Sequence, residues 1–106
     1  ILIGVNSGTA DGTWMSATNP FTLNTWGHLA ITRVSGLVNV YADGSRIIST
    51  TRDVNVDNDI TFRIGEWRNS TEYFTGYLQD FRITKGLARY TAADETSNIP
   101  SAPLEG

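Results

Sequence analysis

Two short turns that contain glycine constrain the fold of this chain more than any other feature of its sequence. They are Ser35-Gly36 and Asp43-Gly44, and each lies between two runs rich in β-branched and apolar residues. Asp-Gly in this setting is a strong hairpin signal, because a two-residue type I′ turn requires positive φ at both central residues, and Ser-Gly is a weaker form of it. The stretch 26–51 is therefore predicted to form a three-stranded antiparallel meander.

The turns also determine which side chains of the meander share a face. Counting back from them places Ile31, Val40 and Ile47 in one cross-strand row. Because side chains alternate between faces, Leu29 and Val38 share the face of this row, and that apolar face is expected to be core. The opposite face is mostly polar and is expected to meet solvent; it carries His28, Ala30, Thr32, Asn39, Tyr41, Arg46 and Ile48.

Patterns outside the meander predict further strands. Four stretches have this character: 1–5, 12–18, 60–64 and 73–84. In the longest of them, 73–84, alternation places Tyr77, Phe81 and Ile83 on one face. One helical turn is expected within 86–93. Two tryptophans are expected in the core because of the large apolar area that they bury: Trp14 and Trp26.

Length and composition narrow the class of protein. The 106 residues, of which 40% are hydrophobic and 18% charged, suit one small domain with a modest core. The net charge is −3 and the chain has no basic run, so a nucleic-acid partner is not expected. No apolar stretch approaches the ~18–20 residues of a membrane span, so membrane insertion is not expected either. The chain has no cysteines, and disulfides therefore cannot stabilise the fold.

Three segments carry a recognisable combination of motifs. They are TWGHLAITRVSGLVNVYADGSRI at 25–47, IGEWRN at 64–69 and FTGYLQDFRITKGLARYTA at 74–92. The first resembles the central meander of the laminin-G-like, concanavalin A-like lectin/glucanase superfamily, and the other two resemble its last core strand and exit. The run RITKGLARYT at 82–91 is typical of copies found on phage tail and virion proteins.

The resemblance implies an all-β, antiparallel jelly-roll sandwich. Such sandwiches usually have about half as many residues again, so the first strands are expected to be missing from this chain. Either a longer protein contains them or a neighbouring chain supplies them, since an open sheet edge invites association. Residues 1–93 are assigned to the sandwich, as the C-terminal part of a larger domain, and 94–106 to an extended tail.

The sequence carries no catalytic constellation, and a non-enzyme is predicted. Glucanases of this superfamily need closely spaced carboxylates, about 5 Å apart in a retaining enzyme. The four glutamates are instead scattered through loops and tail: Glu66, Glu72, Glu95 and Glu105. The single histidine, His28, lies inside the meander without a matching nucleophile motif, so a structural role is expected.

Two kinds of binding site remain as candidates, for calcium and for sugar. Oxygen-bearing side chains alternate in one polar loop and would suit a cation that takes six to eight hard ligands, although a solvated turn is the favoured interpretation; they are Asp53, Asn55, Asp57 and Asp59. For sugar, an aromatic ring would stack on a pyranose while neighbouring polar groups bind its hydroxyls. Two groups have this chemistry: Tyr41 with Asn39 and Arg46, and Trp67 with Arg68 and Asn69. The alternative is that both aromatics simply pack.

These observations favour a non-catalytic structural module on a virion or phage surface, with adhesion to cell-surface glycans as a further role. Its expected partners are other virion proteins or copies of itself, and its expected location is the virion surface or another extracellular setting. No cofactor is required, with calcium as the one candidate ion. The alternatives are a carbohydrate-binding module of a secreted bacterial enzyme or adhesin, and a glycoside hydrolase fragment.

Overall fold

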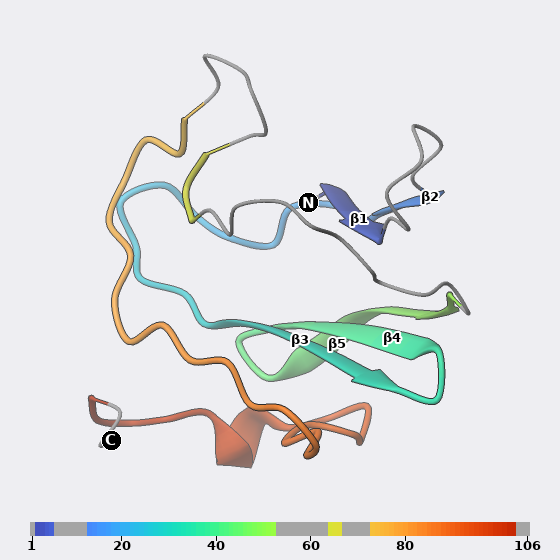
Figure 1. The fold of residues 1–106 in the computed structure, drawn as a ribbon. Helices are drawn as coiled ribbons and strands as arrows, with labels where there is room; N and C mark the ends of the chain where they lie inside the picture. Colours follow the sequence, from blue (N-terminus) through green and yellow to red (C-terminus); the bar gives the residue numbers. More distant parts are fainter. Residues whose placement is uncertain (1, 6–12, 53–63, 67–72, 104–106) are drawn as a thin grey trace.

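The described part of the chain forms two small antiparallel sheets (Figure 1). The computed structural model describes residues 2–5, 13–52, 64–66 and 73–103. In these residues β1 pairs with β2, while β3, β4 and β5 form a three-stranded sheet in that order. The elements are β1 Leu2–Val5, β2 Thr13–Ser16, β3 Leu29–Val34, β4 Leu37–Ala42, β5 Ser45–Thr51 and the 3₁₀ turn η1 Thr96–Asn98. The predicted all-β, antiparallel fold class is confirmed, and no helix of the described ranges is long and apolar enough to cross a membrane.

Both predicted hairpin turns are present in the meander β3–β5. Their central residues have positive φ, at 46° and 81° for Ser35 and Gly36 and at 47° and 80° for Asp43 and Gly44. These values match the geometry that a two-residue turn needs to follow the twist of its strands. Two further hydrogen bonds hold the second turn against the start of the sheet: the Asp43 N–H donates to the His28 carbonyl at 2.8 Å, and Asp43 Oδ1 accepts the His28 N–H at 2.8 Å.

The predicted cross-strand row is only half correct, because β5 contains a β-bulge. Ile31 lies opposite Val40 as expected, but Val40 lies opposite Ile48, and the register shifts between Val40 and Tyr41. Ile47 is the extra residue. In such a bulge two consecutive side chains face the same side, and both isoleucines pack into the core cluster. The assignment of Ile48 to the polar face was therefore wrong.

The core lies between the meander and the β1–β2 hairpin, which covers one side of the sheet (Figure 1). It is made by Met15 of β2, Val38 and Val40 of β4, and Ile48 of β5. We call this side of the meander the core face. Ala17 and Ile47 pack at its border.

The cover over the core face does not extend to β3, which corrects the prediction for two side chains. Leu29 and Ile31 are 50% and 53% exposed although they lie on the core face. The reason is that β2 packs against β5 at the other side of the meander, so it shields β4 and β5 but leaves β3 open. Among the described residues, the central strand β4 is the best covered part of the sheet.

The long strand predicted for 73–84 is absent. Only Tyr73 makes a β-bridge, with Glu66. Asp80 adopts a left-handed backbone conformation, with φ of 54°, which breaks the extended run. Alternation alone cannot make a strand without a neighbour to pair with, and three side chains of the expected buried face are exposed: Tyr77, Phe81 and Ile83.

The elements outside the meander agree only in part with the predictions. β1 and β2 lie within the predicted strands 1–5 and 12–18. The helical turn expected in 86–93 is absent, and the short 3₁₀ turn η1 lies instead in the stretch predicted as an extended tail. Most of the 60–64 strand and the side chain of Trp14 lie outside the described residues. The division of the chain at residue 93 stays a prediction.

Candidate functional site

The side of the meander opposite the core carries the first predicted sugar group. We call this side of the meander the strap face. Its central side chains are those of Thr32 of β3 and of Asn39 and Tyr41 of β4. The prediction that this face meets solvent was wrong, because all three side chains are buried, and Tyr41 is 0% exposed. The C-terminal segment runs across it, as Figure 1 shows below the sheet.

We call the covering residues 90–98 the strap. Its backbone is attached to the meander by three hydrogen bonds: Thr32 Oγ1 to the Tyr90 carbonyl at 3.1 Å, the Arg46 N–H to the Ala93 carbonyl at 3.1 Å, and the Glu95 N–H to the Gly44 carbonyl at 2.8 Å. Asp94 forms a β-bridge with Ser45. The strap therefore docks along the free side of β5 at the second turn.

A buried carboxylate gives the strap its own internal structure. Glu95 Oε1 accepts the N–H groups of Thr91 and Ala92, both at 2.8 Å, and Oε2 accepts a hydrogen bond from the Asn98 side chain. Because these bonds favour the charged form, they lower the pKa of Glu95, with the Ala92 N–H as the largest cause. Likewise, hydrogen bonds from the Thr96 hydroxyl and N–H lower the pKa of Asp94.

Aromatic packing fills the space between the strap and the sheet. The Tyr90 ring lies 5.8 Å from the ring of Tyr41 and 5.7 Å from that of His28, measured between centroids. His28 is half-buried, and this burial lowers its pKa, while the nearby Asp43 carboxylate acts in the opposite direction. His28 thus packs between the meander and the strap, and its purely structural role stays a prediction.

The predicted sugar residues thus have different surroundings. Tyr41 and Asn39 lie beneath the strap, whereas their neighbour Arg46 is exposed at its border. Neither buried side chain offers an open surface to a ligand in this structure. The second predicted group, Trp67 with Arg68 and Asn69, lies outside the described residues, and so do the calcium candidates Asp53, Asn55, Asp57 and Asp59. The part of the chain that is described contains no group of three acidic or histidine side chains able to hold a metal.

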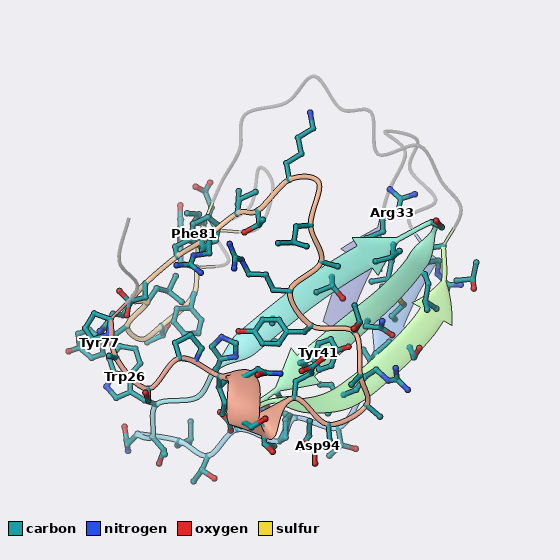
Figure 2. The ribbon with its side chains drawn as sticks, turned by 90° about the horizontal axis from the view of Figure 1, so that it is seen from below. Trp26, Arg33, Tyr41, Tyr77, Phe81 and Asp94 are labelled. Atoms are coloured by element: carbon teal, nitrogen blue, oxygen red, sulfur yellow. The ribbon has the colours of Figure 1, made fainter. Side chains whose placement is uncertain are left out.

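An exposed aromatic pair stands at the end of the molecule beyond the strap face. Trp26 and Tyr77 lie side by side in Figure 2, and their two segments run together in Figure 1. They are 66% and 85% exposed, so the prediction that Trp26 belongs to the core was wrong. We call this pair the aromatic ledge. The sequence carried a signal for it, since Trp26 directly follows a turn-like Asn-Thr pair and precedes a glycine.

The loop that carries Trp26 is ordered by local contacts. Asn19 Oδ1 accepts the Phe21 N–H at 3.1 Å, and Asn24 has a φ of 60°, so the chain turns sharply before Trp26. The Phe21 ring lies directly against the backbone of Gly27, at a place where no Cβ would fit. Phe21 thus occupies the inner side of the loop and Trp26 the outer side.

The segment that carries Tyr77 is held in a similar way. The Phe74 N–H donates to the Gly65 carbonyl at 2.8 Å, and the Phe74 ring covers Gly76, where an added Cβ would lie 3.0 Å from it. Phe74 therefore folds back onto its own segment and leaves the next aromatic, Tyr77, facing outward. In both segments, then, a phenylalanine ring near the ledge packs against a glycine.

Comparison with known proteins identifies the family. Residues 1–89 match the sequence model of a laminin-G-type family described as the concanavalin A-like lectin/glucanases superfamily. The chain belongs to this superfamily. The predicted resemblance to it is confirmed, whereas a phage or virion type is not shown by the match.

One curated relative of this chain is adhesion G-protein coupled receptor V1 from Danio rerio. It is 32% identical over 87 residues, which cover 78% of this chain but only 1% of the receptor. The chain therefore corresponds to a very small part of that protein. No solved structure matches the chain.

The superfamily includes glucanases, which use paired carboxylates for catalysis, so the positions of the glutamates are relevant. Of the two glutamates in the described residues, Glu95 is buried and its oxygens are occupied by strap hydrogen bonds, and Glu66 is half-buried beside Tyr73. They come from separate segments. That the chain is not an enzyme stays a prediction.

Proposed function

We propose that this chain is a non-catalytic recognition module of an extracellular protein and that it binds carbohydrate through the aromatic ledge. The observation that carries the proposal is the exposure of Trp26 and Tyr77 side by side on a lectin-type fold. Large aromatic side chains are normally buried, so an exposed pair marks an interaction surface.

The ledge has the chemistry that a sugar requires. The flat faces of Trp26 and Tyr77 offer apolar contact to the C–H groups of a pyranose, while their N–H and O–H groups can bind hydroxyls. Exposed polar side chains of Asn24, Thr25 and Gln79 belong to the same two segments. This mixture of rings and hydrogen-bonding groups favours a hydroxyl-rich ligand over a purely apolar one.

The extracellular and adhesive setting is supported by the relatives rather than by the site. The curated relative is named as an adhesion receptor, and the superfamily is named for lectins. A single ledge is small, so each site would bind weakly, and many copies on one surface would supply avidity. Adhesion is thus the role that fits one shallow site on a small module.

A virion or phage particle is the more specific setting proposed for this module. It is supported by the run RITKGLARYT at 82–91, which resembles copies on such particles. A complete jelly roll, with further strands over the exposed Leu29 and Ile31, is proposed with it. The full parent sequence tests both points, because it would show the fused domains and any additional strands.

The ledge is tested by measuring binding of the domain to an array of mono- and oligosaccharides. Trp26→Ala and Tyr77→Ala are each expected to weaken binding by at least about tenfold, because aromatic anchors dominate such contacts. Leu23→Ala is the matched control, since Leu23 is 90% exposed in the Trp26 loop but is aliphatic. Unchanged binding in both aromatic variants would show that the ledge is not the site.

The same array tests the two other parts of the proposal. Released sugar products during incubation would contradict the non-catalytic role. Repeating the binding with calcium and with a chelator tests the calcium site proposed at Asp53, Asn55, Asp57 and Asp59, which would raise affinity only when calcium is present.

A further inference from the structure

Three buried polar atoms at the strap face have no hydrogen-bond partner in the part of the chain that the structure describes. They are Nδ1 of His28, Oδ1 of Asn39 and the hydroxyl of Tyr41. A buried polar atom without a partner destabilises the arrangement that buries it, because it has given up its bonds to water. Burial of these three atoms therefore lowers the stability of the closed arrangement, in which the strap covers them.

The strap also has hydrogen bonds of its own. The carboxylate of Glu95 binds Thr91, Ala92 and Asn98, so these three hydrogen bonds lie within the strap and do not involve the sheet. Its connection to the meander consists of the β-bridge at Ser45 with two backbone hydrogen bonds, one bond from Thr32 and the packing of the Tyr90 ring. By contrast, β4 is paired along its whole length on both sides. Opening of the strap thus requires much less free energy than unfolding of the sheet.

We propose that the strap is an autoinhibitory cover that opens as a unit and exposes a second carbohydrate-binding surface, the strap face. The carbohydrate assignment rests on the function proposed for the ledge, whereas the opening does not. In the closed state the Tyr90 ring packs beside the Tyr41 ring, tilted by 44° with 5.8 Å between centroids. In the open state a sugar ring would take that place.

The chemistry of the strap face selects a hydroxyl-rich ligand over a peptide strand. The backbone groups of β4 are already used by β3 and β5, so a peptide could not add to this strand by backbone pairing. What an incoming ligand meets is a set of side chains: the hydroxyls of Thr32 and Tyr41, the amide of Asn39 and one phenol ring. These are donors and acceptors beside a flat apolar face.

A disulfide across the β-bridge tests the proposal. Ser45→Cys with Asp94→Cys joins strap and sheet at a cross-strand pair flanked by two backbone hydrogen bonds, where the Cα separation of about 4.5 Å suits a disulfide. The chain has no other cysteine, so the reduced form of the same protein is the control. Trp26→Ala is included to remove binding at the ledge.

Amide hydrogen exchange gives the first readout, without any sugar. We expect Arg46 and Glu95 to exchange at least about tenfold faster in the reduced form than in the oxidised form, while the β3–β4 amides exchange equally in both. In the unmodified protein, the amides of Arg46 and Glu95, whose hydrogen bonds join the strap to the sheet, should exchange together and ahead of that ladder. Equal rates for Arg46 and Glu95 in the two redox forms, or their exchange together with the ladder, would overturn the opening.

Sugar binding gives the second readout. The reduced Trp26→Ala protein is expected to bind the array at least about tenfold more tightly than its oxidised form, and Asn39→Ala should abolish the difference. A strap that opens without any gain in binding would overturn the second surface and leave the ledge unaffected. Conversely, if the ledge proved not to bind sugar, the expected difference in binding between the reduced and oxidised forms would remain.

Discussion

The two faces of the β3–β5 meander are closed by different means. The core face is closed by apolar packing between Met15, Val38, Val40 and Ile48. The strap face is closed by a segment held through hydrogen bonds, with tyrosine rings packed beneath it. Burial alone therefore does not distinguish a core from a covered surface, because Val40 and Tyr41 are both 0% exposed. Val40 belongs to the apolar core cluster, whereas the buried hydroxyl of Tyr41 has no hydrogen-bond partner among the described residues.

The largest effect is expected on the core face. Val40→Ala should lower the free energy of unfolding by about 3 kcal/mol, because it removes two buried methyl groups and leaves a cavity. Ile31→Ala is the matched control, since Ile31 lies directly opposite Val40 but is half exposed, and it should lower stability by about 1 kcal/mol or less. Urea denaturation measures both. An equal loss in the two variants would mean that β3 is covered as well as β4.

A glycine at the strap contact should give the next largest effect. Gly44→Ala is expected to lower stability by about 2 kcal/mol, because a Cβ there is strained at φ of 80° and would lie 2.5 Å from the Thr96 Cα. Gly86→Ala is the control: φ is 86° and nothing lies within 4 Å of the added Cβ, so only the strain of about 1 kcal/mol remains. Thermal unfolding of the two proteins isolates the contact with the strap. Identical losses would show that the strap accommodates the extra atom.

A single hydrogen bond to the strap should have a smaller effect. Thr32→Val keeps the side-chain shape but removes the bond to the Tyr90 carbonyl, so we expect a loss of about 1 kcal/mol in urea denaturation. Thr51→Val, at the exposed end of β5, should change stability by about 0.5 kcal/mol or less. If the two threonines behave alike, this bond does not help to hold the strap.

The smallest effect is expected from pH, and it should act on the strap face alone. The pKa of Glu95 is lowered in the folded protein, so its contribution to stability is complete above its ordinary value of 4.5 and disappears as pH falls through the folded pKa. The lowered pKa of His28 acts in the same direction from pH 6.5 downward, because the unfolded chain binds that proton more readily. Acid should therefore loosen the strap before the core.

This expectation is measured by following unfolding and the exchange of the Arg46 amide between pH 7 and pH 3. Glu95→Gln should flatten the dependence below pH 4.5. Asp80→Asn, an exposed carboxylate outside the strap, is the control and should leave that dependence unchanged. A slope as large as that of the unmodified protein would assign the acid sensitivity to other groups, since the lowered pKa of Asp94 leaves only a smaller slope toward pH 3.

What the sequence could predict depended on how local the cause was. The two turns needed only their own residues, so both hairpins and the first half of the register were correct. The bulge at Ile47 has no marker in the sequence, because Ile47 and Ile48 are the same residue type. The 73–84 segment shows the converse: its alternation is that of a strand, but Asp80 turns left-handed and no described strand pairs with it.

For the candidate sites too, local relations were predictable and long-range contacts were not. The sequence correctly grouped Tyr41 and Arg46, which lie opposite each other, with Asn39 two residues away on β4. It could not foresee their cover, because the bond from Thr32 to Tyr90 joins residues 58 positions apart. Trp26 was assigned to the core from residue type alone, whereas its loop, with Phe21 on the inner side, places it outside.

The bulge at Ile47 makes one position of the meander tolerant to shortening. A deletion in a regular strand inverts every residue beyond it, so that solvent-facing groups turn inward. Loss of Ile47 would instead restore an ordinary ladder, with Arg46 still opposite Tyr41 and Ile48 still opposite Val40. Among natural variants of this domain, length differences inside β5 should therefore concentrate at this single position.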